Sequence, residues 1–240
     1  MLAFDENETT GEDTEILEIL GHRFSIATAP DDFNADKKTL FATMVWNGSK
    51  VLAQFILENC DLYIRGKRVI EFGAGAGLPS LCALQSGASF MCLTDYPSAS
   101  VLTTLRKNLQ ANAESTDLVS KSLVVGHKWG EDVRDLVVGS TLYDVVLAAE
   151  CLWKHDCHQI FLQSIAACLK PGGIVLLTFS HHIPGLEADD LNFFVKARSF
   201  GFEVIEATSV PSAHMWSEKT VDIYIYRMRL TNIQISGAES

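Results

Sequence analysis

The chain has 240 residues, of which 48% are apolar and 20% charged, so it can bury a full core within one α/β domain and is not a disordered chain. The formal net charge is −11, and residues 1–22 contain seven acidic residues and neither Lys nor Arg. The sequence has no basic patch or stripe that would release phosphate counterions, which argues against direct nucleic-acid binding.

We expect residues 1–22 to be an acidic, flexible tail, residues 23–230 to form one domain, and residues 231–240 to be a short C-terminal tail. No apolar stretch is long enough to span a bilayer, and residues 1–22 do not resemble a secretory signal. We therefore expect a cytoplasmic protein without membrane contact, and we expect it to be a monomer. The six cysteines contain no C-x-x-C pair, which predicts reduced core cysteines and neither a zinc site nor a disulfide frame.

Apolar strands and amphipathic helices alternate along most of the chain. After an irregular stretch, the expected elements in chain order are a helix over 47–60, a strand over 68–72, a helix over 78–86, a strand over 89–95, a helix over 97–109, strands over 122–125 and 143–149, a helix over 156–169, a strand over 174–179, a helix over 187–200, and strands over 202–209 and 221–228. This alternation predicts a parallel sheet.

The last two strands have no helix between them, because their linker, residues 210–220, is polar and contains Pro211. They are expected to form an antiparallel hairpin at the sheet edge. The predicted fold is therefore α/β, with a Rossmann-like seven-stranded sheet that is mostly parallel, a C-terminal antiparallel hairpin, and helices on both faces. A closing hairpin of this kind is typical of methyltransferases and separates this sheet from ordinary dinucleotide-binding sheets.

The first strand of the predicted sheet runs into a glycine-rich loop, Gly73-Ala74-Gly75-Ala76-Gly77. Glycines let the backbone turn sharply and approach a ligand without Cβ clashes. The G-x-G-x-G pattern differs from the dinucleotide fingerprint, whose last glycine position is Leu78 here. The loop alone also fits a tight strand-to-helix turn without a ligand.

Asp95 ends the second strand, 18 residues after Gly77. A carboxylate at that place can accept hydrogen bonds from both ribose hydroxyls of an adenosine cofactor, whichever cofactor it is. The alternative is a cap for the helix that starts near Pro97.

With these pieces assembled, the chain resembles the seven-β-strand protein methyltransferases, and among them the eukaryotic elongation-factor lysine and N-terminal methyltransferase branch, historically called nicotinamide N-methyltransferase-like. The matching stretches are 45–49, 69–81, 94–97, 128–130, 144–153, 169–173 and 179–185. The resemblance implies S-adenosylmethionine as cofactor and a protein substrate, with eukaryotic elongation factor 1-alpha as the expected target.

The resemblance also implies a role for each matching residue. Trp46 would close over the cofactor, Gly73 and Gly75 would pass beside its methionine part, and Asp95 would hold the ribose. Trp129 would cover the adenine, and Ala149 would line the pocket. Four neighbours in the same stretches complete the predicted cofactor-binding set, namely Glu71, Ala74, Gly77 and Tyr96. Trp46 and Trp129 would also fit a role as core aromatics.

Related enzymes usually carry Asp-x-x-Tyr or Asp-x-x-Phe after the fourth strand, where this chain has Glu150-Cys151-Leu152-Trp153. Methyl transfer needs a neutral amine lone pair placed behind the methyl carbon. We hypothesise that Glu150 holds and orients the incoming ammonium and that Trp153 faces it through its ring. The alternative for Glu150 is a cap on the following helix.

Four histidines lie near the expected site, at positions 155, 158, 181 and 182. We interpret them as a polar pocket rim that includes a possible proton acceptor, rather than as metal ligands. Since adjacent strand residues point to opposite faces, one of His181 and His182 should point away from the site. Three other functions stay open: a small-molecule N-methyltransferase, a cofactor-binding scaffold without catalysis, and a nucleotide-dependent oxidoreductase.

Overall fold

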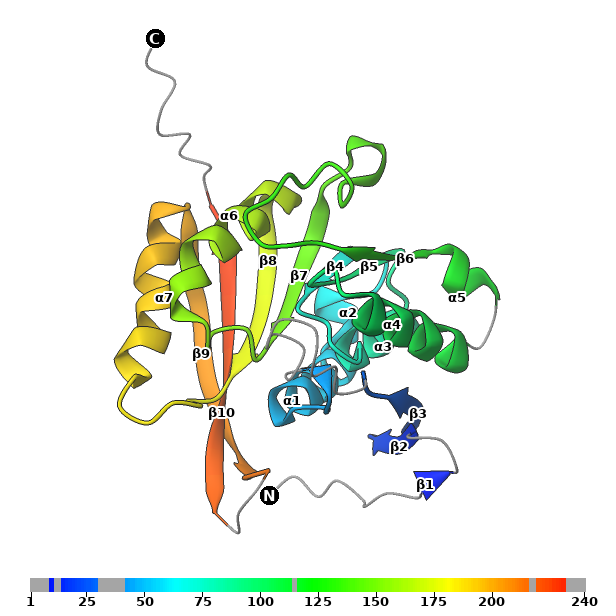
Figure 1. The fold of residues 1–240 in the computed structure, drawn as a ribbon. Helices are drawn as coiled ribbons and strands as arrows, with labels where there is room; N and C mark the ends of the chain where they lie inside the picture. Colours follow the sequence, from blue (N-terminus) through cyan, green and yellow to red (C-terminus); the bar gives the residue numbers. More distant parts are fainter. Residues whose placement is uncertain (1–8, 11–13, 30–41, 114–115, 216–218, 232–240) are drawn as a thin grey trace.

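A seven-stranded sheet forms the centre of the computed structural model, which describes residues 9–10, 14–29, 42–113, 116–215 and 219–231. Its strand order is β6–β5–β4–β7–β8–β10–β9 (Figure 1). The strands are β4 (Arg68–Phe72), β5 (Phe90–Asp95), β6 (Ser122–Gly126), β7 (Tyr143–Ala149), β8 (Leu169–Phe179), β9 (Phe202–Ala213) and β10 (Thr220–Leu230). Strands β4 to β8 pair in parallel, and β10 is antiparallel to both β8 and β9. The predicted sheet is confirmed.

Helices cover both faces of this sheet because consecutive strand residues point to opposite sides. Val145 and Leu147 of β7 belong to one apolar cluster, while Val146 and Ala148 belong to the other. The helices are α1 (Asn47–Glu58), α2 (Cys60–Tyr63), α3 (Leu78–Gln85), α4 (Ala99–Asn112), α5 (Thr116–Ser120), α6 (His158–Cys168) and α7 (Glu187–Ser199). The first cluster packs α1, α3 and α4 on the sheet, and the second packs α6 and α7. None of the helices in the described ranges has the length and hydropathy of a membrane span.

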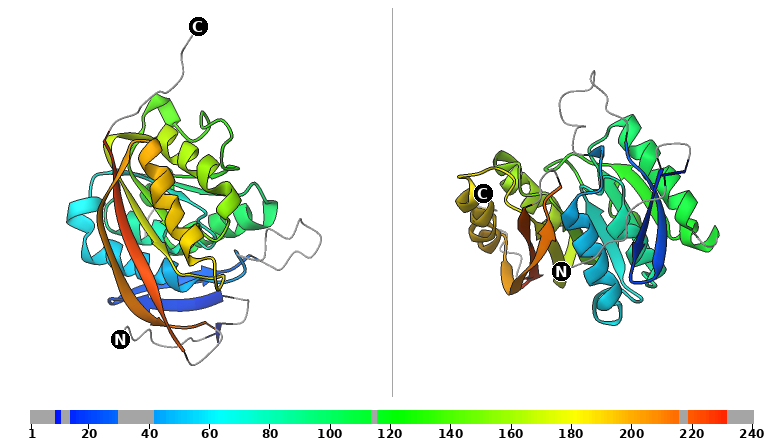
Figure 2. Two further views of the ribbon diagram at one scale, coloured as in Figure 1. Left: turned by 90° about the vertical axis from the view of Figure 1, so that its left-hand side faces the viewer. Right: turned by 90° about the horizontal axis from the view of Figure 1, so that it is seen from below.

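The C-terminal hairpin is longer than the sequence pattern predicts, and it extends beyond the rest of the sheet (Figures 1 and 2). Pro211, which was expected in a linker, lies inside β9 opposite Asp222 of β10. A proline is tolerated there because β9 is an edge strand and pairs only with β10. Pro97, expected in the first turn of a helix, precedes α4 instead. It packs against Gly126, where an added Cβ would lie 2.8 Å from the Pro97 Cα.

The expectation of a flexible tail over residues 1–22 is wrong for residues 14–22. Thr14–Ile19 forms β2, which pairs antiparallel with β3 (His22–Ala27), and the short β1 (Thr9–Thr10) joins them in a separate sheet. Leu17 and Ile19 of β2 are buried together with three residues of β3, namely Phe24, Ile26 and Ala27. Their alternation with acidic residues was the overlooked strand signal. Residues 1–8, 11–13 and 232–240, which include almost all of the expected C-terminal tail, lie outside the described residues.

Two asparagines of α4 join this N-terminal sheet to the domain. The buried Asn108 accepts a hydrogen bond from the Ala27 backbone N–H at 2.8 Å and donates to the carbonyl oxygens of Ala27 and Ala76 at 2.7 and 2.8 Å. Asn112 pairs in the same way with the backbone of Ser25. Because Ala76 belongs to the glycine-rich loop, Asn108 connects the N-terminal strands directly to the segment that borders the candidate site.

Replacing Asn108 with Leu should lower the free energy of unfolding by about 2–4 kcal/mol, because one buried N–H and two carbonyls lose their partner. Urea denaturation followed by circular dichroism measures this change. Gln110→Leu, on the exposed side of the same helix, is the matched control and should change the stability by less than about 0.5 kcal/mol. Equal losses in both variants would contradict the role given to Asn108.

Candidate active site

A cavity of about 480 Å³ lies at the carboxyl ends of the parallel strands, where open α/β sheets bind their ligands. It is lined by the loops that follow β4, β5, β6, β7 and β8 and by the segment that leads into α1. The structure brings eleven of the twelve residues predicted for the site to this cavity: Trp46, Gly73, Ala74, Gly75, Gly77, Asp95, Tyr96, Trp129, Ala149, Glu150 and Trp153.

The glycine-rich loop needs its glycines for conformation and for space. Gly73, Gly75 and Gly77 have φ angles of +66°, +54° and +81°, a region that other residues rarely adopt. A Cβ at Gly73 would lie 2.7 Å from the Cys151 sulfur, whereas a Cβ at Gly75 would meet nothing within 4 Å. The loop backbone is therefore held against the β7 end at Gly73 and is open for close approach at Gly75.

Asp95 fixes this loop from the end of β5. Its Oδ2 accepts a hydrogen bond from the Gly75 backbone N–H at 2.7 Å, and its Oδ1 accepts one from the Tyr96 N–H at 2.6 Å. Burial raises the pKa of Asp95, while these two amides lower it. Asp95 does not cap α4, whose N-cap residue is Ser98. Each carboxylate oxygen has a further lone pair, so the group can still accept hydrogen bonds from a vicinal diol.

Glu71 is the one predicted cofactor-binding residue that the structure does not bring to the cavity. It is fully buried behind the glycine-rich loop, and its carboxylate accepts hydrogen bonds from the backbone N–H and hydroxyl of Ser80 in the first turn of α3. The other carboxylate oxygen, Oε1, has no partner in the described structure. Burial raises the pKa of Glu71 to about 8, against the opposing Ser80 hydrogen bonds, so the group is largely protonated at neutral pH.

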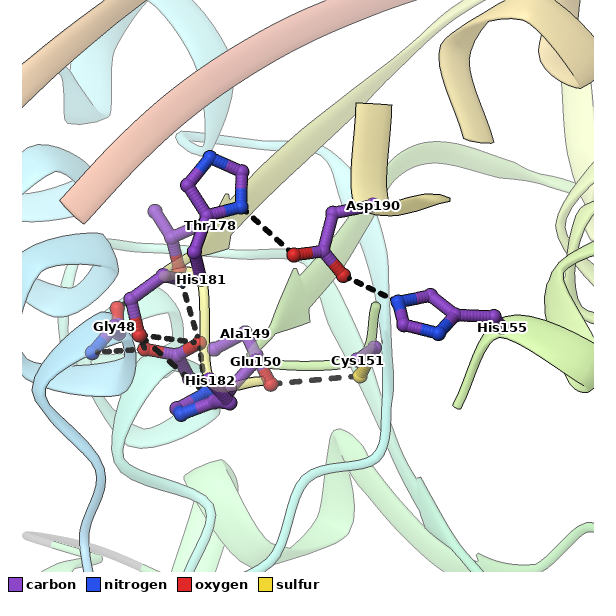
Figure 3. A network of polar contacts seen from close by, with 10 residues as sticks. Gly48, Ala149, Glu150, Cys151, His155, Thr178, His181, His182 and Asp190 are labelled. Atoms are coloured by element: carbon purple, nitrogen blue, oxygen red, sulfur yellow. Dashed lines mark hydrogen bonds and ion pairs between the residues drawn. The ribbon is translucent and has the colours of Figure 1, made fainter. Parts of the chain in front are cut away.

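Glu150 occupies a strained position at the end of β7, with φ of +55°. Its Oε1 accepts a hydrogen bond from the Gly48 N–H in the first turn of α1 at 3.0 Å. Its Oε2 accepts a hydrogen bond from the Ser180 N–H at 2.9 Å. It also accepts one from Nε2 of His182 at 2.9 Å (Figure 3). A Cβ at Gly48 would lie 2.5 Å from Oε1, so only glycine fits there. Glu150 thus caps α1 and not the helix that follows it.

The two adjacent histidines point in different directions, as predicted. His182 lines the cavity, hydrogen-bonds Glu150 and meets the Trp46 ring edge-on with 5.1 Å between centroids. His181 instead hydrogen-bonds Asp190 of α7 at 2.7 Å through Nδ1, and the same carboxylate hydrogen-bonds Nε2 of His155 at 2.7 Å (Figure 3). This bridge ties the loop after β7 to α7. No group of three or more potential metal ligands with suitable geometry occurs among the described residues.

The aromatic residues combine packing with exposure to the cavity. Trp129 stacks on Phe161 of α6 with 4.2 Å between ring centroids and lines the cavity as well. No role was predicted for Gly48, Ser180 or His127 from the sequence. The ring of His127 meets the Phe72 ring edge-on, and its Nε2 lies 3.0 Å from the Ser164 hydroxyl. Only the folded chain brings these residues together.

Comparisons with known proteins show the family of this chain. A family model described as lysine methyltransferase matches residues 30–200. The chain belongs to this lysine methyltransferase family. Two relatives are named protein N-terminal and lysine N-methyltransferase EFM7: the one from Yarrowia lipolytica is 36% identical over 72% of this chain and 71% of its own length, and the one from Schizosaccharomyces pombe is 30% identical over 84% and 81%.

A solved structure with the same fold is the T. thermophilus 16S rRNA methyltransferase RsmC in complex with its methyl donor and guanosine. Its TM-score is 0.55 at 20% sequence identity, and the match covers 89% of this chain and 50% of that one. The chain is accordingly a methyltransferase, and its cofactor is S-adenosylmethionine. The residues of this lysine methyltransferase fit that cofactor: Gly75 leaves room for close approach, and Asp95 offers acceptors for a ribose. When bound, the cofactor supplies an electrophilic methyl group.

Replacing Glu71 with Gln should stabilise the fold in a pH-dependent way. A carboxyl whose pKa is raised from 4.5 to about 8 on folding keeps a proton that the unfolded chain releases. As the pH rises between these two values, the carboxyl therefore lowers the free energy of unfolding by an increasing amount. The free energy of unfolding of Glu71→Gln relative to the unaltered chain should therefore rise by about 3 kcal/mol from pH about 5.5 to about 8.

Urea titrations at the two pH values measure this difference. Glu58→Gln, which replaces an exposed carboxylate on α1, serves as the control and should give a difference that is nearly the same at both pH values. A Glu71→Gln difference that does not change with pH would contradict the raised pKa.

Proposed function

We propose that this chain transfers methyl groups from S-adenosylmethionine to amines of a protein, namely an N-terminal α-amino group and a lysine side chain. The names of the two relatives support this acceptor class. The observation that carries the proposal is the open end of the cavity. There Glu150, Trp153 and His182 line the wall, while Ile183 beside them is still 40% exposed to solvent.

An open end suits a substrate that is itself a protein, because a polypeptide must present its amine from outside. Glu150 lies at this end with its side chain 5% exposed, and a carboxylate there attracts an ammonium group. Trp153 is half-buried in the same wall and offers a ring to a cation. A small-molecule methyltransferase that acts on a nicotinamide-like ring would be expected to enclose its acceptor in an aromatic slot, which makes it the weaker alternative.

The target that we propose is eukaryotic elongation factor 1-alpha. The support is the sequence resemblance to the elongation-factor methyltransferase branch, carried by Trp46, by Thr94 to Pro97, by Trp129 and by the stretch from Phe179 to His182. With this target, the enzyme acts in the cytoplasm, and we propose that it does so as a monomer.

Incubating the purified chain with isotopically labelled S-adenosylmethionine and recombinant elongation factor 1-alpha should label the protein. Peptide mass spectrometry should locate the methyl groups on the N-terminal amine and on a lysine. Acetylating the N-terminus beforehand should remove only the first label. Labelling of free nicotinamide with no label in any protein would contradict the proposal and favour the small-molecule alternative.

Asp95→Ala should weaken cofactor binding by about 10- to 100-fold, because it removes the acceptors proposed for the ribose and releases the Gly75 amide. Isothermal titration calorimetry with S-adenosylmethionine and with its demethylated product measures both affinities. Asp132→Ala, which replaces an exposed acid paired with Arg134, is the control and should bind both as the unaltered chain does. Unchanged affinity in Asp95→Ala would rule out its role in holding the ribose.

A further inference from the structure

The acceptor amine reaches the methyltransferase as an ammonium ion and must lose a proton before it can attack. The cavity wall in the described structure contains four carboxylate or imidazole side chains, namely Asp95, His127, Glu150 and His182. The position and the hydrogen bonds of each group decide whether it can accept the proton of the substrate amine.

Two of the four lie on the side of the cavity that is proposed to hold the adenosine. Asp95 ends β5 and His127 follows β6, and both strands lie beyond β4 from the end where Glu150 is placed. Neighbouring strands are about 4.8 Å apart, so three strand spacings, or roughly 14 Å, separate β5 from β8. Burial also lowers the pKa of His127. Neither group suits an amine that enters beside Glu150.

Glu150 lies at the correct end, but its carboxylate is already engaged. It accepts hydrogen bonds from two backbone amides, those of Gly48 and Ser180, and from the ring of His182. Protonating it would break this arrangement at the first turn of α1, where the helix dipole favours a negative charge. Glu150 therefore acts as a fixed anion rather than as a proton acceptor.

His182 remains, and its contacts set it up as a base. The Glu150 carboxylate can only accept, so the hydrogen on this ring lies on Nε2 and the lone pair lies on Nδ1. Among the described residues the hydrogen-bond partners of the ring, Glu150 and Ser180, both contact Nε2, which leaves Nδ1 for a substrate. A carboxylate that fixes the tautomer of an imidazole is the arrangement found in many general bases.

The charges around His182 support this assignment. Burial lowers its pKa, but the hydrogen bond and charge of Glu150, helped by the charge of Asp190, outweigh burial and raise the pKa above its ordinary value. The other titratable groups around it are the adjacent His181 and, across a hollow of about 70 Å³ that His182 also lines, His214. Lys154 lines the main cavity. The net effect is a stronger base than an ordinary histidine.

We infer that His182, held by Glu150, accepts the proton of the substrate amine, and that this base favours an N-terminal α-amino group over a lysine. The inference rests on the proposed function. An N-terminal ammonium, with a pKa of about 7.7–8.0, transfers its proton to such an imidazole at little cost, whereas a lysine ammonium, with a pKa of about 10.4, does so with an unfavourable difference of several pKa units.

In the proposed step the ammonium N–H bond breaks, and the proton moves to Nδ1 of neutral His182, which becomes an imidazolium. The freed lone pair forms the new N–C bond while the S–C bond of the donor breaks and its electron pair stays on sulfur. The methylated amine leaves as a cation, and the imidazolium returns its proton to solvent. The cycle thus releases one proton and consumes one methyl donor for each methyl group.

The test compares His182→Gln with the unaltered enzyme on two peptides, one with a free N-terminal amine and no lysine, and one with an acetylated N-terminus and a single lysine. Gln can keep a hydrogen bond to Glu150 but cannot take up a proton. At pH about 7, kcat on the N-terminal peptide should fall about 10-fold, with KM changed little, because only roughly a tenth of that amine is already neutral. At pH about 9.5 the loss should nearly disappear, because solvent has already deprotonated that amine.

On the lysine peptide the loss should persist at pH about 9.5, since most of that amine is still protonated. The matched control is His181→Gln, whose ring bonds Asp190 outside the main cavity; any loss in this variant should be the same at all pH values. A readout independent of turnover is the NMR titration of the His182 ring, whose pKa should lie above that of an ordinary histidine and should fall in Glu150→Gln.

A His182→Gln loss that does not change with pH, or a His182 pKa that Glu150→Gln leaves unchanged, would show that His182 only supports the structure and would overturn the inference. If the unaltered enzyme methylates neither peptide nor the full-length target protein, the proposed function fails and this inference fails with it. The two failures are therefore separable by the activity of the unaltered enzyme.

Discussion

The acceptor end of the cavity depends on the hydrogen bonds that the buried carboxylate of Glu150 accepts. This carboxylate joins three segments that are distant in the sequence: the first turn of α1 through Gly48, the end of β7 to which it belongs, and the end of β8 through Ser180. Breaking a buried charge from its partners is strongly destabilising, so these segments hold one another in a single arrangement. The positive φ of Glu150 and the missing Cβ of Gly48 both follow from this requirement.

The same device recurs at the cofactor end, where acidic side chains near the ends of neighbouring strands each fix one loop. Asp95 holds the Gly75 amide from β5, and Glu71 holds the start of α3 from β4. These carboxylates differ in what burial does to them. Glu71, without access to solvent, is kept largely neutral, whereas Asp95 remains half-buried at the cavity wall and keeps acceptors for a ligand. Acidic side chains thus serve structure where they are fully buried and ligand binding where they are partly exposed.

The sequence predicts the parts of this molecule that depend on local patterns, and misses those that depend on contacts between distant residues. The strand over Tyr143–Ala149 and the position of Asp95 follow from apolar runs and spacing. The side of the sheet to which Glu71 points cannot be predicted in this way, because a fully buried strand is apolar on both faces. The contact of Glu150 with Gly48, 102 residues away, has no local signal. In β2 the alternating strand pattern was present, but the acidic residues around it led to the prediction of a flexible tail.

The charge balance of the cavity connects these observations to turnover. A bound methyl donor brings a sulfonium cation and the acceptor brings an ammonium cation, and like charges in a partly dehydrated cavity repel each other. Asp95 and Glu150 flank the site from opposite ends, and proton uptake by His182 makes the acceptor neutral before attack. After transfer, the cofactor carries no sulfonium charge and the amine is cationic again. Until His182 returns its proton to solvent, the carboxylate of Glu150 therefore still faces two cations, which are now the imidazolium that it hydrogen-bonds and the methylated amine.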